Sequence, residues 1–204
     1  MFGSLTISNV VTILVCLLVS MTVHEFMHAF VAFKLGDTTA MEKGRVSFNP
    51  LHHIDPVMTV LLPAATLLLF GAPILAAKPV PFNPNRLKFG EYGAALMAAA
   101  GPLSNLALAF IGALILRFVY LNGFLGQAMQ TFVVLNVILA VFNLVPIPPL
   151  DGSRVLYAFA PEPVQEFMER IEPFGFFIII ILVLWGGASN VLMNLDNLVL
   201  RLLP

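Results

Sequence analysis

Residues 24–28, His-Glu-Phe-Met-His, form a His-Glu-x-x-His pattern inside an apolar stretch. On a helix, His24 and His28 share one face, so their imidazoles can bind one zinc ion. Glu25 is not expected to be a ligand. It can take a proton from metal-bound water and deliver it to a leaving amine. The alternative is a histidine pair packed in a helix bundle, which is disfavoured because ionisable groups inside a membrane span are costly and usually functional.

A catalytic zinc ion needs a third protein ligand and an open position. Asp151 is the candidate, because Arg117 is the only formally charged residue between Pro102 and Leu150. Asp151 lies in the sequence FNLVPIPPLDG, whose prolines stop helical pairing and whose Gly152 permits an unusual turn. The alternative role is the N-cap of a helix over residues 153–160, and capping does not exclude ligation.

Three ordered motifs resemble those of the site-2 protease family of intramembrane zinc metalloproteases. They are HEFMH at 24–28, GPLSN within 98–110, and NLVPIPPLDG within 142–152. Residues 47–63 and 77–84 look like segments typical of a compact bacterial and archaeal branch of that family.

The resemblance implies a zinc endopeptidase that cuts transmembrane segments of membrane proteins. It implies His24, His28 and Asp151 as ligands of one zinc ion per chain, and Glu25 as the catalytic acid and base. Many relatives carry a PDZ-like or nucleotide-sensing domain, and we expect none within these 204 residues.

The same resemblance places Asn143 near the substrate or the oxyanion. An amide N–H aimed at the scissile oxygen stabilises the negative charge that develops there. The alternative is an asparagine that satisfies backbone groups freed at the proline break. Asn105 has the same two interpretations, and the structural one is favoured because Gly101 and Pro102 are expected to break the helix just before it.

The composition limits the class of protein. Of the residues, 59% are hydrophobic and 10% charged, whereas roughly 25% are charged in ordinary soluble domains. These values exclude a soluble globular domain and a disordered chain. The net charge of −1 gives no indication of nucleic-acid binding, and the single Cys16 excludes an internal disulfide.

The apolar runs predict an all-α polytopic membrane protein, a single integral-membrane domain over 1–204. Four spanning helices and one re-entrant or displaced segment are expected from the runs 7–33, 54–77, 92–119, 127–147 and 173–189. An amphipathic helix on the membrane interface is expected at 161–172, and an amphipathic tail at 190–204.

Residues 39–49 alternate around Gly44, which predicts a small surface hairpin. The next polar residues are His52, His53 and Asp55. They could be auxiliary metal or substrate contacts, or part of a loop at the membrane interface with an Asp-Pro turn, and the loop is favoured.

The run 54–77 decides the topology. If it crosses the membrane, Asp151 arrives at the face opposite the histidines, and lysines and arginines divide five to five. If it returns without crossing, Asp151 arrives beside the histidines, and the lysines and arginines divide eight to two. The eight are Lys34, Lys43, Arg45, Lys78, Arg86, Lys88, Arg154 and Arg170. The second arrangement predicts a prokaryotic plasma-membrane protein with its N-terminus outside and its zinc toward the cytoplasm.

Two other functions fit parts of the pattern. A membrane metal-ion transporter also needs intramembrane histidine and aspartate ligands, but it has no need for Glu25. An inactive relative acting as a scaffold would not require every catalytic residue to be present.

Overall fold

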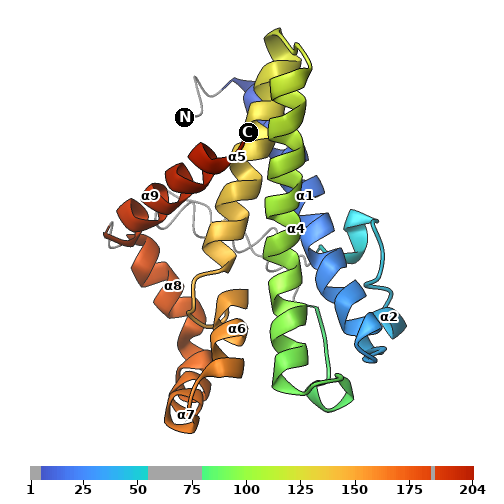
Figure 1. Cartoon of the computed structure of the whole chain (residues 1–204), viewed down its shortest axis with the longest axis vertical. Helices are drawn as coiled ribbons and strands as arrows, with labels where there is room; N and C mark the ends of the chain where they lie inside the picture. Colours follow the sequence, from blue (N-terminus) through green and yellow to red (C-terminus); the bar gives the residue numbers. More distant parts are fainter. Residues whose placement is uncertain (1–5, 55–79, 185–186) are drawn as a thin grey trace.

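Three long helices form the centre of the computed structural model, which describes residues 6–54, 80–184 and 187–204 (Figure 1). They are α1 (Ile7–Lys34), α4 (Glu91–Phe118) and α5 (Gly123–Asn143). At 1.5 Å per residue, even a 21-residue helix such as α5 extends about 31 Å, which matches the hydrocarbon core of a bilayer. In the part of the chain that the structure describes, these three helices are the ones long and apolar enough to cross a membrane.

Small side chains hold the three helices together. Ala29 and Ala32 of α1 are fully buried, and Ala109 of α4 packs with Val133 and Val137 of α5. Small residues let helix backbones approach closely, which matters where lipid supplies no hydrophobic drive for association. Larger apolar side chains cover the outer faces at roughly half exposure, among them Leu14, Val15, Leu103, Phe110 and Ile111.

The end of α1 and the beginning of α4 lie at the same end of the bundle. The backbone N–H of Lys88 donates to the carbonyl of Leu35 at 2.8 Å, and the N–H of Asn83 donates to the carboxylate of Asp37 at 2.6 Å. The chain therefore returns to the end at which it left α1. Since α5 runs antiparallel to α4, it brings the residues after Asn143 to that same end (Figure 1). The predicted behaviour of 54–77 falls on residues 55–79, outside the described residues.

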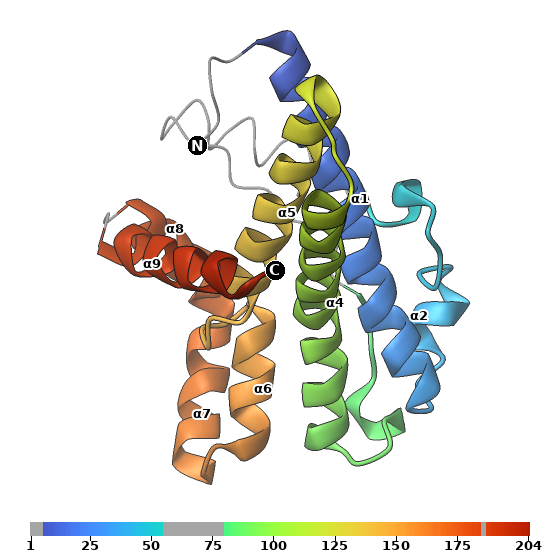
Figure 2. The same ribbon diagram turned by 45° about the horizontal axis from the view of Figure 1, so that its top comes forward.

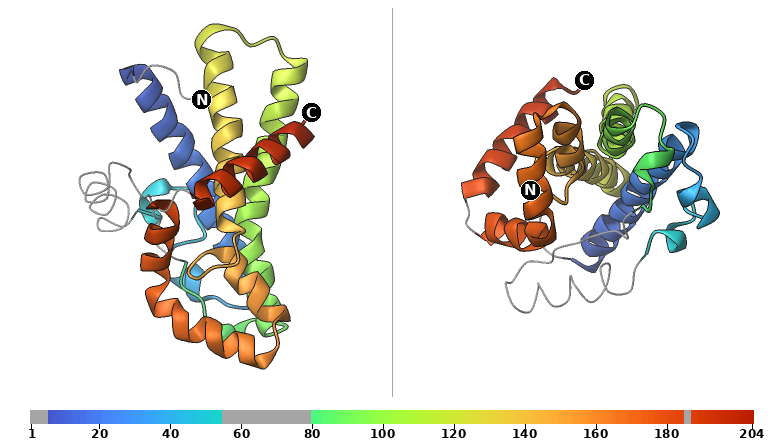
Figure 3. Two further views of the ribbon diagram at one scale, coloured as in Figure 1. Left: turned by 90° about the vertical axis from the view of Figure 1, so that its left-hand side faces the viewer. Right: turned by 90° about the horizontal axis from the view of Figure 1, so that it is seen from below.

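Five further helical segments follow α5 on the flank opposite α1 and α2 (Figure 2). They are α6 (Asp151–Phe159), α7 (Glu162–Ile171), η4 (Glu172–Phe174), α8 (Gly175–Leu184) and α9 (Gly187–Leu202). Of the fourth expected span, over 173–189, the structure describes α8 and the start of α9, and residues 185–186 between them lie outside the described residues. The C-terminal tail crosses α5 obliquely, with Val199 and Leu200 packed against its apolar cluster (Figure 3).

The hairpin expected at 39–49 is wrong, and no strand occurs among the described residues. The short helix α2 (Thr39–Glu42) begins this stretch, and the 3-10 turn η1 (Pro50–His52) ends it. Side chains satisfy the backbone in place of a strand ladder. A ring nitrogen of His52 bonds to the carbonyl of Gly44 at 2.7 Å, and the buried guanidinium of Arg45 donates to the carbonyl of His52 at 2.6 Å.

The helix break expected at Gly101 and Pro102 is also wrong, because α4 continues through both residues. Proline removes one backbone donor, and neighbouring helices in a membrane protein can sustain a helix past that loss. Both residues are buried.

Asp37 closes the base of the segment that connects α1 to α4. Its buried carboxylate accepts hydrogen bonds from the N–H and the hydroxyl of Thr39 and from the N–H of Asn83. Burial raises the pKa of this carboxyl, but the three hydrogen bonds outweigh it, so the pKa lies below its ordinary value.

Replacing Asp37 by Asn should therefore destabilise the protein by about 1–3 kcal/mol at neutral pH, because an amide cannot accept all three bonds. The stabilising effect of a lowered carboxyl pKa is present at neutral pH and is lost as the pH falls below about 4. Thermal unfolding in detergent, followed by circular dichroism, should show the difference between wild type and Asp37→Asn shrinking in acid. Glu42→Gln is the control, since its exposed contacts with Thr38 and Arg86 contribute little. An equal loss from both substitutions would contradict the assignment.

Candidate metal centre

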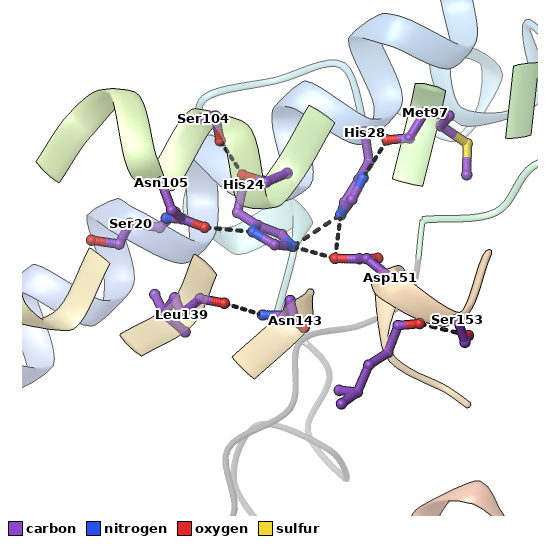
Figure 4. A network of polar contacts seen from close by, with 12 residues as sticks. Ser20, His24, His28, Met97, Ser104, Asn105, Leu139, Asn143, Asp151 and Ser153 are labelled. Atoms are coloured by element: carbon purple, nitrogen blue, oxygen red, sulfur yellow. Dashed lines mark hydrogen bonds and ion pairs between the residues drawn. The ribbon is translucent and has the colours of Figure 1, made fainter. Parts of the chain in front are cut away.

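Three potential ligand atoms converge between α1 and the start of α6 (Figure 4). His24 and His28 project from α1, and Asp151 is the first residue of α6. The two Nε2 atoms lie 2.9 Å apart, and Oδ2 of Asp151 lies 3.1 Å from that of His24 and 3.3 Å from that of His28. Within the ranges that the structure covers, this is the group of histidine and carboxylate side chains with the geometry of a metal site.

The hydrogen bonds on the far side of each ring determine which nitrogen carries the proton. Nδ1 of His28 lies 2.8 Å from the carbonyl of Met97, and Nδ1 of His24 lies 2.6 Å from the amide oxygen of Asn105. Both partners only accept, so both Nδ1 atoms are protonated, and in the neutral rings both Nε2 atoms present lone pairs. Two lone pairs that face each other beside a carboxylate repel one another unless a cation lies among them.

The donor set fits zinc. Ligand atoms around a tetrahedral zinc ion, with bonds of about 2.1 Å, lie roughly 3.4 Å apart, close to the separations in this cluster. Two imidazoles and one carboxylate are also the protein ligands of many catalytic zinc sites, in which a fourth position is left to water or substrate.

Gly101 of α4 lies directly against the two imidazoles. A Cβ atom at this position would overlap Nε2 of His28 and would lie 2.6 Å from Nε2 of His24. The sequence prediction assigned Gly101 to a helix break. The structure instead shows that its missing side chain leaves the space in which the ligand atoms meet.

The proline-rich loop before α6 brings Asp151 to the histidines. Leu150 is the N-cap of α6, so the alternative prediction, with Asp151 itself as N-cap, is wrong. Gly152 is helical and makes no unusual turn, contrary to the prediction. Its Cβ would overlap the carbonyl of Leu144 and would lie 2.7 Å from that of Val145, so glycine is needed here for close approach.

Glu25 lies on α1 between the two histidines in sequence and is buried. Its carboxylate is close enough to His24, His28 and Asp151 for electrostatic interaction with all three, and it also interacts with His53. The next residue, Phe26, stacks on Phe48 with ring centroids 3.9 Å apart, so the segment after α2 covers this part of α1.

The histidines of that covering segment do not join the metal cluster. His52 bonds to the carbonyl of Gly44, and Nε2 of His53 bonds to that of Ser47 at 2.8 Å. Nδ1 of His53 is buried and has no hydrogen-bond partner among the described residues. The third member of the predicted group, Asp55, lies outside the described residues.

The two asparagines differ in what their amides can still donate. Both N–H groups of Asn105 are engaged, with the side chain of Asn136 at 2.8 Å and the carbonyl of Ser20 at 3.3 Å, so no donor is left for an oxyanion. The amide of Asn143, at the end of α5, donates to the carbonyl of Leu139 at 2.8 Å, and its second N–H has no partner among the described residues (Figure 4).

Sequence reasoning missed four residues at this centre: Ser20, Met97, Gly101 in its steric role, and Asn136. Polarity inside apolar runs could have indicated Ser20 and Asn136, because uncharged polar side chains within spanning helices need partners there. Met97 contributes only its carbonyl, which every residue possesses, and so carries no sequence signal.

Replacing Gly101 by Ala should abolish metal binding, because the added methyl group occupies the space of the ligand atoms. Metal content of the purified protein in detergent measures this directly. Gly112→Ala is the matched control on the same helix, since its Cβ would crowd Val133 on α5, away from the metal centre. That control should retain metal, and a Gly101→Ala protein with full metal content would contradict the steric role.

Several known proteins are similar to this chain in sequence. Residues 119–185 match the model of Peptidase family M50. Putative zinc metalloprotease YwhC of Bacillus subtilis is 37% identical over 194 residues, covering 91% of this chain and 85% of the relative. Putative zinc metalloprotease Rip2 of Mycolicibacterium smegmatis is 28% identical over 182 residues, covering 85% and 66%. Putative zinc metalloprotease MJ0611 of Methanocaldococcus jannaschii is 37% identical over 134 residues, covering 65% and 62%.

No solved structure matches the chain. The resemblance seen in the motifs is nevertheless confirmed by relatives that align over most of both sequences. The chain belongs to Peptidase family M50, the family of the site-2 proteases.

Proposed function

We propose that this protein is an intramembrane zinc metalloendopeptidase that hydrolyses peptide bonds in transmembrane segments of other proteins. The observation that carries the proposal is the convergence of two imidazole lone pairs and one carboxylate inside a bundle of apolar helices. The relatives are named putative zinc metalloproteases, and these names support the same activity.

The depth of the centre supports cleavage within the membrane. His28 precedes the end of α1 by six residues, and His24 by ten, which corresponds to about 9 Å and 15 Å along the helix axis. A soluble peptide would have to enter the bilayer region to reach these side chains. A transmembrane segment is already present at that depth, so it is the substrate class that we assign.

We also propose that the zinc end of the bundle faces the cytoplasm. Lys34, Arg86 and Lys88 lie at the ends of α1 and α4 that meet there, and Arg117 lies in the last turn of α4, at the other end. An excess of lysine and arginine is typical of the cytoplasmic side of a membrane protein. The proposal places the protein in a prokaryotic plasma membrane, since the relatives are bacterial and archaeal.

Each residue of the centre has a separate role in peptide hydrolysis. His24, His28 and Asp151 would hold one zinc ion, which when bound lowers the pKa of a water molecule and polarises the scissile carbonyl. Glu25 lies beside this cluster and would accept the proton of the attacking water. It would then donate that proton to the leaving amine. Asn105 holds His24 in position and would not contact substrate.

Asn143 is the residue that we propose for the oxyanion. Its amide is fixed by one N–H bond to Leu139, and Figure 4 shows it on the α5 side of His24 and Asp151. The remaining N–H can stabilise the negative charge that develops on the scissile oxygen.

The proposal predicts that Glu25→Gln binds as much zinc as wild type but cleaves no substrate, because an amide cannot accept the proton. His24→Ala and Asp151→Ala should lose the metal as well. The measurement uses purified proteins in detergent, with metal content determined and a panel of single-span proteins supplied as substrates. Glu91→Gln, an exposed position in the first turn of α4, is the control and should behave as wild type.

The same variants separate the rival functions when zinc transport into liposomes is measured as well. A metal-ion transporter should tolerate Glu25→Gln and move zinc into liposomes at the wild-type rate. A scaffold should bind its client without cleaving it in either form. Wild-type protein that binds zinc and transports it without cleaving any of the panel would contradict the peptidase assignment.

A second prediction concerns Asn143. Asn143→Ala should lower kcat about 100- to 1,000-fold while zinc content stays at the wild-type level, because one oxyanion donor is lost. Steady-state kinetics with one cleaved substrate would measure kcat and KM separately. A fall in zinc content, or a loss confined to thermal stability, would instead indicate a structural role for this amide.

A further inference from the structure

A chain of buried side-chain hydrogen bonds extends from the metal centre to α5. Ser20 on α1, Asn105 on α4 and Asn136 on α5 are all fully buried. Asn105 links Nδ1 of His24, at 2.6 Å, to the amide oxygen of Asn136, at 2.8 Å. The amide nitrogen of Asn136 then bonds to the hydroxyl of Ser20 at 2.8 Å and to the carbonyl of Phe132 at 2.9 Å.

The direction of every bond in this chain follows from two backbone carbonyls, those of Phe132 and Ser20, which can only accept. The carbonyl of Phe132 can only accept, so the side-chain atom of Asn136 that meets it is the NH2 group. The oxygen of that amide therefore faces Asn105 and needs a donor. Asn105 meets it with its own NH2 group, whose other hydrogen goes to the carbonyl of Ser20. The oxygen of Asn105 is then the atom left to face His24.

We propose that Asn136 is a positioning residue of the metal centre, which sets the imidazole tautomer of His24 by fixing the side-chain amide of Asn105. The proposal rests on the zinc site assigned above. Asn136 touches neither metal nor substrate. It determines that the Asn105 oxygen accepts the Nδ1 proton of His24, so that the Nε2 lone pair points toward His28 and Asp151.

Without the oxygen of Asn136, the amide of Asn105 is held against turning over only by its longer bond, at 3.3 Å, to the carbonyl of Ser20. After such a turn, its NH2 group would face Nδ1 of His24, which could meet it only as an acceptor, and the ring proton would move to Nε2. That tautomer cannot bind a cation through Nε2. Partners that orient a metal-bound histidine typically contribute 10- to 100-fold to metal affinity.

The experiment measures zinc affinity in detergent by competition with a chromophoric chelator. Asn136→Leu should lower the affinity 10- to 100-fold. Asn136→Asp, which keeps an oxygen for Asn105, should lose much less. Asn136→Ala replaces the leucine variant if that protein does not fold. Thr131→Val is the matched control on α5, since among the described residues its hydroxyl bonds only to the carbonyl of Gln127 in its own helix. The zinc affinity of this variant should equal that of wild type.

Two readouts distinguish positioning from general packing. In an Asn105→Leu background, Asn136→Leu should cause no further loss of zinc affinity, because Asn136 acts through Asn105. The 15N resonances of histidine in the metal-free protein should show the Nδ1-protonated form of His24 in wild type. The Asn136→Leu protein should show the Nε2-protonated form.

The outcomes are separable. If wild type binds zinc and a folded Asn136→Leu protein binds it with equal affinity, this inference is overturned and the proposed function stands. Additive losses in the double variant would overturn it as well, since packing alone gives that result. Wild type that binds no zinc would overturn both proposals.

Discussion

The rest of this structure depends on two imidazole nitrogens that lie 2.9 Å apart, each, in the neutral rings, with its lone pair directed at the other. Such an arrangement is unfavourable without a positive charge between the rings. Packing and hydrogen bonds must therefore keep the two imidazoles in place. Each ring is accordingly tied at Nδ1 to an acceptor on α4. The carboxylate of Asp151 arrives from the opposite flank and supplies the charge that balances a cation.

The helices around this centre pack closely because glycines lie at their contact points. Gly101 gives the imidazoles room, and Gly152 lets the start of α6 approach the carbonyls of Leu144 and Val145. Gly175, at the start of α8, lies in the same way against the carbonyl of Pro148. None of these three glycines needs a backbone conformation closed to other residues. Their function is steric, which is the reason that the loop carrying Asp151 can pack so tightly.

The sequence predicted the ligand types because their signal is local or nearly so. The spacing of His24 and His28 is a property of one helix turn, and Asp151 stands out as an acid after a long run almost free of charge. Gly101 and Asn136 could not be assigned in this way, because their roles depend on contacts with other helices. A glycine beside a proline indicates a break as readily as a close approach. The hairpin prediction failed for a related reason, since alternation over a few residues carries no information on side chains that bond to carbonyls.

The pairing of Leu35 with Lys88, and of Asp37 with Asn83, has a consequence for how such a chain can vary. These contacts join the two ends of the connection between α1 and α4, so the closure of that loop is secured at its base. The entropic cost of a closed loop grows only slowly with its length, by about 0.6 kcal/mol for each doubling. A longer or shorter connection can therefore be accommodated with little effect on the three long helices. A change in the length of this connection therefore need not move His24, Glu25 and His28, which lie on α1, or the groups of α4 that hold the two imidazoles.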